Sequence, residues 1–412
     1  MTRQEIQQEA IELALNNDTV ILQWCTSLGK SKAAIDIMNT ICEQDLNKRL
    51  DVLFVVAEVA HKENWDKEFV KFGIAVCTIV VECYASLKRY KNTKWDLVIL
   101  DECHHIGSDI RVDLLSTMSI DKLVCLSATI PQETFMTIGA LRKDSGYNKL
   151  AISRITLKDA IEWGILPEPK VFLIPLLLDN INQDCIIVEE WGKSAQRVTI
   201  KCKLHERWQY LTNKSKYPNV KLEISCTQQQ KYDYLTEQFE YWKLQFFRTR
   251  QERTKNKWLQ TGAKRKRFLG ECKTLSAEIL LNKLSNKRFI CFCSSIEQSE
   301  SLGGSNCIHS KKKDSLSIID SFNKKEIDNL FAVGMLQEGQ NLTDIEVGVI
   351  IQLDGQERAF IQKFGRSLRA QNPIQFVFYY RGTKDMDYLE NILEGVSEEY
   401  ITEVDNLLDL EV

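Results

Sequence analysis

The sequence has no long hydrophobic run. Its longest apolar stretch, residues 171–178, is far shorter than the roughly 20 residues that a membrane-spanning helix needs. Residues 1–10, MTRQEIQQEA, lack the apolar segment of a secretory signal. We therefore expect a cytoplasmic protein with no membrane segment.

Paired cysteines are also missing. The chain has thirteen cysteines, but none stands in a Cys-x-x-Cys pair, and Cys125, Cys291 and Cys293 lie inside apolar, strand-like runs. A zinc site needs a cluster of ligands that this spacing does not provide. The cysteines are best interpreted as buried free thiols in a reducing compartment.

The chain lacks a strong net charge as well. Its 412 residues include 54 Lys and Arg and 57 Asp and Glu, for a net charge of −3, which argues against a small basic DNA-binding protein. This near-neutral total is the sum of one strongly basic segment and one strongly acidic segment. Residues 242–273 hold eleven basic and two acidic residues, and residues 385–412 hold ten acidic residues and no Lys or Arg.

Short apolar runs alternate with helical patterns in two parts of the chain, which predicts an α/β protein with two parallel sheets covered by helices. Between the first two runs, Ala34, Ile37 and Ile41 recur at helical spacing. The length fits two or three domains. The strand-like runs lie at 20–24, 52–56, 96–100, 122–127, 288–293, 330–336, 347–353 and 374–380.

The stretch between these two halves has a different pattern. It has strand-like segments after residue 171 and a long helical pattern from Gln228 to Leu259. The predicted divisions are a first domain over 1–170, an inserted strand-plus-helix region over 171–273, a second domain over 274–395 and an acidic tail over 396–412.

The segment CTSLGKS, residues 25–31, follows an apolar run and opens a helical pattern. Backbone N–H groups and a helix N-terminus hold phosphate in that context. Lys30 would reach the β- and γ-phosphates, and the Ser31 hydroxyl would bind Mg²⁺. Trp24 replaces the usual first glycine, so a chance loop is the alternative. The loop residues expected around the phosphates are Thr26, Ser27, Leu28, Gly29, Lys30 and Ser31.

Two carboxylates, Asp101 and Glu102, follow the run at 96–100. Ligands of parallel sheets bind at the carboxyl ends of the strands. Asp101 is expected to hold Mg²⁺, and Glu102 to polarise the attacking water as general base. A solvated acidic pair is the alternative reading.

Three polar residues of IQKFGRSLR, Gln362, Arg366 and Arg369, share one face if the segment is helical. The arginines are candidates for fingers that stabilise charge on a transferred phosphoryl group; an ordinary solvated surface is the alternative. Ser127 and Thr129 of LSATIP can hydrogen-bond at the nucleotide site, although such turns are common.

In this order, CTSLGKS, DECH, SAT and Q-x-x-G-R-x-x-R resemble the motifs of superfamily 2 helicases and translocases of the DExH type, among them phage helicases and the motor subunits of restriction enzymes. The resemblance covers about residues 1–170 and 275–395. It implies two tandem RecA-like domains with ATP and Mg²⁺ in the cleft between them, and ATP hydrolysis coupled to movement on nucleic acid. It also implies a bacterial or phage-infected cell.

Lesser motifs extend this resemblance. ECYASLKR resembles a strand-gripping segment, RFICFCSSIEQSE motif IV and MLQEGQNLTDI motif V. The resemblance thus implies nucleic-acid contacts by Tyr84, Ser86 and Ser294, and a nucleotide contact by Gly339. In this family a glutamine before the phosphate loop reads adenine.

Gln7 is the better match to that adenine-reading glutamine, and Gln4 is the alternative. The chain departs from the family at Ser27 and Leu28 of the loop. It also has Ala57-Glu58 where proline-threonine is common.

The basic segment 242–273 interleaves aromatic residues among its cations. A phosphate-tracking surface is favoured over a helix with a solvated basic face, and its predicted nucleic-acid contacts are Lys264, Arg265, Lys266 and Arg267. For the acidic tail, a closing helix is favoured over a partner-binding arm or a DNA-mimicking autoinhibitor.

The sequence therefore predicts an ATP-dependent DNA helicase or translocase. DNA is favoured over RNA because the chain has DECH and no proline-threonine pair. An RNA helicase of the same superfamily, a nucleic-acid-binding adaptor with a degenerate ATPase site and a motor subunit served by a separate nuclease chain are the alternatives.

Overall fold

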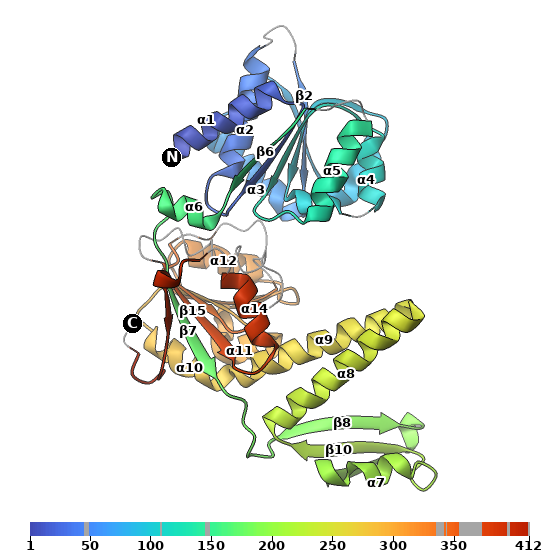
Figure 1. Ribbon diagram of the computed structural model, residues 1–412. Coiled ribbons are helices and arrows are strands. Elements are labelled where there is room, and N and C mark those ends of the chain that lie inside the picture. The colour runs from blue at the N-terminus through green and yellow to red at the C-terminus, as the bar shows by residue number, and fades with distance from the viewer. Residues whose placement is uncertain are drawn as a thin grey trace.

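The computed structural model describes residues 1–44, 49–107, 109–144, 149–334, 342, 344–353, 373–393 and 396–410. These residues form two α/β domains, joined through the short helix α6 (Leu157–Glu162), and an inserted part that projects from the second domain (Figure 1). Two parallel sheets flanked by helices confirm the predicted α/β class.

The first domain is built on a six-stranded parallel sheet in the order β3-β2-β4-β5-β1-β6. Both faces are buried: Phe54 and Val56 face α1, α2 and α3, whereas Leu53 and Val55 face α4, α5 and the 3₁₀ helix η1. Continuous apolar strands follow from this double burial. The elements are α1 (Arg3–Asn16), β1 (Thr19–Trp24), α2 (Lys30–Gln44), β2 (Asp51–Val56), α3 (Val59–Phe72), β3 (Thr78–Cys83), η1 (Tyr84–Tyr90), β4 (Lys94–Asp101), η2 (Cys103–Ile106), α4 (Asp109–Ser116), β5 (Ser119–Ser127), α5 (Gln132–Asp144) and β6 (Leu150–Ile155).

The second domain holds a seven-stranded parallel sheet in the order β12-β13-β11-β14-β15-β7-β16. Helices α12 and α14 contribute to the apolar core on one face, and α10 to the core on the other. The elements are β7 (Lys170–Leu176), α10 (Thr274–Lys283), β11 (Phe289–Phe292), α11 (Ile296–Gly303), β12 (Cys307–His309), α12 (Ser315–Asn323), β13 (Asn329–Val333), β14 (Val347–Ile350), β15 (Ile374–Tyr380), α14 (Lys384–Leu393), η6 (Glu398–Tyr400) and β16 (Ile401–Glu403).

Two predicted divisions differ from this arrangement. Strand β7, assigned to the inserted region, pairs with β15 in the second sheet. Strand β16, assigned to the acidic tail, pairs with β7. The favoured closing helix is therefore replaced after α14 by a strand that completes the sheet.

The inserted part consists of a small three-stranded sheet and two long helices. The sheet order is β8-β10-β9, with β8 antiparallel and β9 parallel to β10. The predicted single helix over 228–259 is instead a hairpin, because the chain turns at Arg250, whose φ is +53°. The elements are β8 (Cys185–Trp191), β9 (Val198–Lys203), α7 (Arg207–Thr212), β10 (Val220–Cys226), α8 (Gln228–Thr249) and α9 (Glu252–Cys272).

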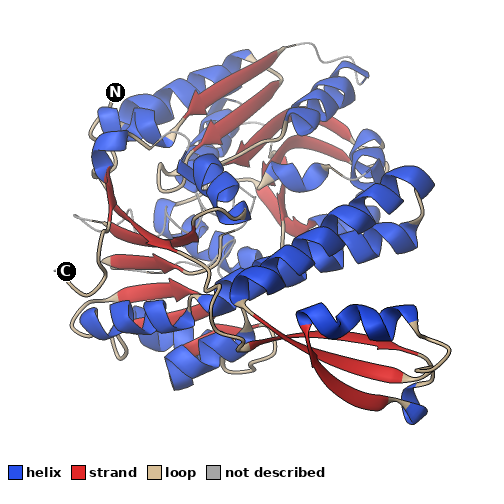
Figure 2. Cartoon of the chain, turned by 60° about the horizontal axis from the view of Figure 1, so that its bottom comes forward, coloured by secondary structure: helices blue, strands red, loops and turns tan. Residues whose placement is uncertain are grey.

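We call the hairpin of α8 and α9 the arm. Figure 2 shows its two helices side by side along their length. At its root, the fully buried Lys273 ammonium contacts Asp385 Oδ2 at 2.6 Å and donates to the carbonyl oxygens of Ile351 and Phe378, both at 2.9 Å. An ammonium has three N–H donors, so each one has a partner.

The arm root, where α9 ends and α10 begins, is also joined by hydrogen bonds to the loop after β11. The buried Gln298 side chain donates to the Gly270 carbonyl and to Thr274 Oγ1, and accepts from the Ser294 amide and hydroxyl. The arm is therefore attached to the second domain by buried polar groups whose bonds are satisfied.

The structure also bears on the expectations about cysteine and membranes. All thirteen cysteines are free, ten of them buried and three half-buried, as predicted. Within the described ranges, no helix is long and apolar enough to cross a membrane. The same part of the chain holds no cluster of three or more His, Cys, Asp or Glu side chains suited to a metal.

Candidate nucleotide site

The loop between β1 and α2 has two residues with left-handed backbone conformations, which are common in anion-binding turns. Ser27 and Gly29 have φ of +68° and +92°, and turns of this kind make backbone N–H groups converge. Lys30 Nζ donates to the carbonyl oxygens of Trp24 at 3.0 Å and Cys25 at 3.4 Å, so the ammonium folds back over the loop. The buried Leu28 side chain faces the core, which leaves only its backbone to the site.

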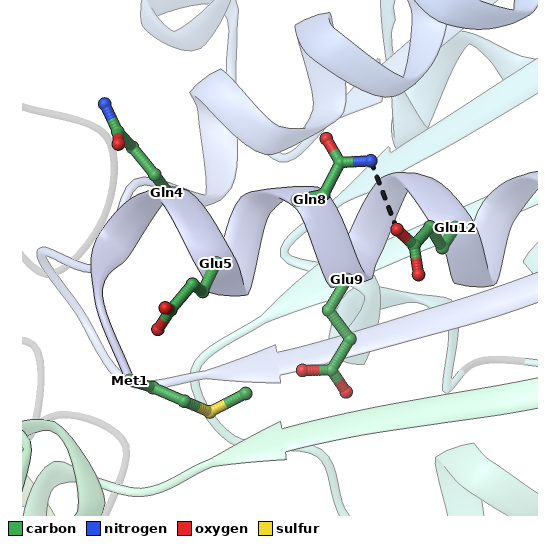
Figure 3. Close-up of a pocket in the computed structure, with 6 residues that line it drawn as sticks. All are labelled: Met1, Gln4, Glu5, Gln8, Glu9 and Glu12. Atoms are coloured by element: carbon green, nitrogen blue, oxygen red, sulfur yellow. Dashed lines mark hydrogen bonds between the residues drawn. The ribbon is translucent and has the colours of Figure 1, made fainter.

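Gln7 on α1 lies against this loop. A Cβ atom built on Gly29 would stand 3.1 Å from Gln7 Nε2. Gln4 is exposed and instead lines a hollow along α1 with Glu5, Glu9 and their neighbours (Figure 3). Of the two predicted glutamines, only Gln7 is thus placed where it could contact a nucleotide held by the loop.

Asp101, at the end of β4, is held from two sides. Its Oδ2 accepts a hydrogen bond from Trp65 Nε1 at 2.9 Å, and its backbone carbonyl accepts one from Tyr84 Oη at 3.0 Å. The Glu102 amide lies 3.1 Å from Oδ1. These bonds fix the orientation of the carboxylate.

The surroundings raise the pKa of Asp101 to about 6. Burial is the largest cause and the neighbouring Glu102 carboxylate the second, because both disfavour a further negative charge. The bond from Trp65 and the positive charges of His61 and Lys30 act in the opposite direction. Asp101 and Lys30 are therefore close enough to influence each other electrostatically.

Glu102 has a left-handed backbone, with φ of +47°. Its Oε2 atom lies 3.2 Å from Ser127 Oγ and 3.3 Å from His104 Nδ1. Ser127 Oγ is also 3.0 Å from His104 Nδ1 and 2.8 Å from the Thr129 carbonyl oxygen. The SAT hydroxyl and the DECH histidine thus hold the candidate base in place.

These residues fit a magnesium–nucleotide ligand. The hydroxyl of Ser31 and the carboxylate of Asp101 are oxygen donors of the kind that Mg²⁺ prefers. The loop N–H groups and Lys30 suit the phosphates. Gly29 has no side chain between the loop and Gln7, and a larger residue at this position would press against the Gln7 amide.

Sequence reasoning missed Trp65 and His104. His104 belongs to DECH, so the motif itself was an available signal. Trp65 had no local signal, because its contact with Asp101 depends on how α3 crosses the sheet edge. Gly339, Gln362, Arg366 and Arg369 lie outside the described residues.

The predicted nucleic-acid contacts outside the arm, Tyr84, Ser86 and Ser294, differ in their exposure. Tyr84 is buried under the DECH strand, with Arg111 over its ring at 5.5 Å. This burial is a correction, because its side chain does not face a surface. Ser86 is half-buried on η1, and Ser294 is half-buried with its hydroxyl donating to Gln298 Oε1 at 2.9 Å.

The four basic residues predicted as phosphate contacts on the arm differ in burial and in ion pairing. Arg265 is buried with its guanidinium 4.4 Å from the Phe239 ring centre, so its assignment to a phosphate surface is wrong. Arg267 forms ion pairs with Glu271 at 2.8 Å and Glu297 at 2.6 Å. Lys264 is exposed and Lys266 half-buried.

Comparison with known proteins places these features in a wider context. Residues 271–371 match the helicase conserved C-terminal domain. No curated protein matches the chain. Among solved structures, Saccharomyces cerevisiae Dbp5 bound to RNA and ADP BeF3 is similar with a TM-score of 0.58, 12% identity and coverage of 97% of this chain and 89% of that one. The Pyrococcus furiosus Hef helicase domain gives a TM-score of 0.47, 13% identity and coverage of 94% and 97%.

The similarity to Dbp5 extends over almost the whole of both chains, and at this identity it concerns the fold. The two parallel sheets correspond to the tandem RecA-like domains of helicases. The chain therefore has the tandem RecA-like fold predicted from its motifs, and the match to the helicase conserved C-terminal domain begins at residue 271, where the second part of this fold resumes after the arm.

Proposed function

We propose that the protein is a superfamily 2 helicase or translocase that hydrolyses ATP between its two domains to move on or remodel DNA. One observation carries the proposal: the phosphate loop with Lys30, the carboxylates Asp101 and Glu102, and Ser127 lie at the carboxyl ends of the neighbouring strands β1, β4 and β5, along the carboxyl-end edge of the first sheet. Ligands of open α/β sheets bind at that edge.

Each residue has a distinct proposed role. Lys30 and the loop amides bind the phosphates, with Gln7 beside them for the base. Ser31 and Asp101 hold Mg²⁺, which neutralises phosphate charge when bound. Glu102, oriented by Ser127 and His104, accepts the proton of the attacking water.

The second domain would complete the site. Gln362, Arg366 and Arg369, together with Gly339, belong to motifs that place charged and polar groups opposite the phosphates in the family that the sequence resembles. Arginines supplied in this way stabilise charge on the transferred phosphoryl group. Hydrolysis would then depend on closure of the two domains.

An RNA helicase is the second candidate, because the similar Dbp5 structure is bound to RNA. DNA stays favoured on sequence grounds, since the chain has DECH and Ala57-Glu58 in place of proline-threonine. The choice between polymers is open to direct measurement.

The test is ATP hydrolysis with single-stranded DNA, duplex, fork, Holliday junction and RNA as separate activators. We expect stimulation by DNA and its loss in K30A. The matched control is K32A, one position beyond Ser31 on the same helix, where Lys32 pairs with Asp36 instead. Hydrolysis that no nucleic acid stimulates, or equal losses in K30A and K32A, would contradict the proposal.

A further inference from the structure

The outer end of the arm carries cations that have no carboxylate partner. We define the arm tip as residues 241–258, which contain one acidic residue, Glu252. No ion pair involves the following five cations anywhere in the described part of the chain: Arg248, Arg250, Arg253, Lys255 and Lys257.

Three other cations of the arm are paired or buried, whereas Lys264 is exposed and Lys266 half-buried without an ion pair in the described part of the chain. Lys243 lies 3.4 Å from Glu240, and Arg267 pairs with two glutamates. Arg265 is buried near the root. Five unpaired cations therefore lie together at the tip, and of the four residues selected from the sequence only Arg265 and Arg267 are buried or paired.

Aromatic rings are interleaved with these cations. The Trp258 ring is stacked on Phe246, with centroids 5.6 Å apart. The Arg250 guanidinium lies 5.1 Å from the centre of the Phe247 ring, and Lys257 Nζ 4.2 Å from that of Trp242. The Phe246–Trp258 and Trp242–Lys257 contacts join α8 to α9, and the nearby Arg248, Arg253 and Lys255 are exposed.

Two aromatic residues at the tip remain open to solvent. Tyr241 is 52% exposed and Phe247 49% exposed. The Trp258 indole N–H is buried without a partner. An exposed ring beside unpaired cations is the combination on which single-stranded nucleic acid stacks its bases while its phosphates are neutralised.

We propose that the arm tip is a contact site for single-stranded nucleic acid, separate from the nucleotide edge of the first domain. Arg248, Arg253 and Lys255 bind phosphates, and Phe247 offers a ring face to a base. This inference rests on the proposed function in one respect, since it assumes that the same polymer activates the motor.

The test measures equilibrium binding of a labelled single-stranded 20-mer, without ATP, over a range of salt concentrations. The variant is R248Q/R253Q/K255Q, which keeps good helix formers at all three positions. We expect affinity to fall about tenfold, and the slope of log affinity against log salt to decrease by about 2 as three phosphate contacts are lost.

The matched control is K193Q/K214Q/K216Q, which removes the same charge from exposed positions beside the small sheet. We expect binding by this control within twofold of the parent protein, and an unchanged melting temperature in both triple variants. Equal losses in the two variants would overturn the proposal, because they would indicate net charge alone.

Other outcomes also decide the question. An unchanged affinity and salt slope in the tip variant would overturn the site and leave the tip for an acidic protein partner. A loss confined to duplex binding would overturn the single-stranded assignment. Because binding is measured without ATP, failure of the proposed motor would appear separately, as ATP hydrolysis that no nucleic acid stimulates in the parent protein.

Discussion

The nucleotide edge of the first domain and the arm tip hold polar groups in opposite ways. At the edge, Asp101 and Glu102 each have bonds from neighbouring side chains. At the tip, cations such as Arg253 and Lys255 have no ion pair within the described ranges. Fixed groups suit a reaction whose geometry must be set beforehand, whereas exposed, unpaired cations suit a polymer that is held through its charge and released in steps.

The largest expected effect separates chemistry from binding. E102Q keeps the size of the side chain but removes the carboxylate that we propose accepts the proton of the attacking water. We expect stimulated ATP hydrolysis to fall about 1000-fold, with single-strand affinity within twofold of the parent. A parallel loss of affinity would show that the two regions are not independent.

The next effect concerns the arm root, which connects these regions. K273M leaves Asp385 as a buried charge without its partner, and we expect the free energy of unfolding in urea to fall by about 3 kcal/mol. K273M/D385N removes that charge and should recover part of the loss. No recovery would mean that Lys273 stabilises the root through its two carbonyl bonds alone.

A smaller effect tests how Asp101 is oriented. W65F removes the indole N–H that donates to Asp101, and we expect the Mg²⁺ concentration for half-maximal hydrolysis to rise about tenfold, roughly the value of one hydrogen bond to a charged group. Thermal stabilisation by Mg²⁺ and ADP should decrease in step.

The control is W95F, whose indole donates to Thr93 within the same domain. It should change stability comparably and leave the Mg²⁺ dependence as in the parent. Equal Mg²⁺ effects in W65F and W95F would refute a specific role for Trp65.

The smallest effect sharpens the role of the tip. F247L keeps an apolar side chain but removes the ring, and we expect single-strand affinity to fall by about 1 kcal/mol without any change in the salt slope. Y210L, which removes a ring from α7, is the control. A changed slope would assign Phe247 to positioning the cations instead of stacking.

Local sequence patterns predicted most of the strands and helices, but they did not predict which distant elements contact each other. The buried strands could be recognised because both faces of each sheet are covered, so their apolar runs are continuous. The position of β7 in the second sheet could not be predicted, because its partner β15 lies some 200 residues later in the chain. The turn at Arg250 has no glycine to mark it, so two helices resembled one.

At the site, too, local patterns did not show which side chains are buried by distant parts of the chain. The loop residues are neighbours in the sequence, and so are the two carboxylates, so the sequence alone was enough to propose both as site residues. Tyr84 was misplaced, since the spacing in a 3₁₀ helix does not reveal which side faces the core. Arg265 belongs to a basic run whose members are distributed around a helix, and only the packing of α8 selects the one that is buried.

The firm root of the arm has a mechanical consequence. Helix α9 spans 21 residues, or about 30 Å at 1.5 Å per residue. Because buried bonds fasten its base to the second domain, the hairpin would act as a lever if that domain rotated, and each degree of rotation about the root would displace the outer end by about 0.5 Å. A rotation of about 7° would move it roughly 3.4 Å, the rise of one nucleotide along a duplex strand. The arm would thus magnify a small hinge motion to the scale of one nucleotide.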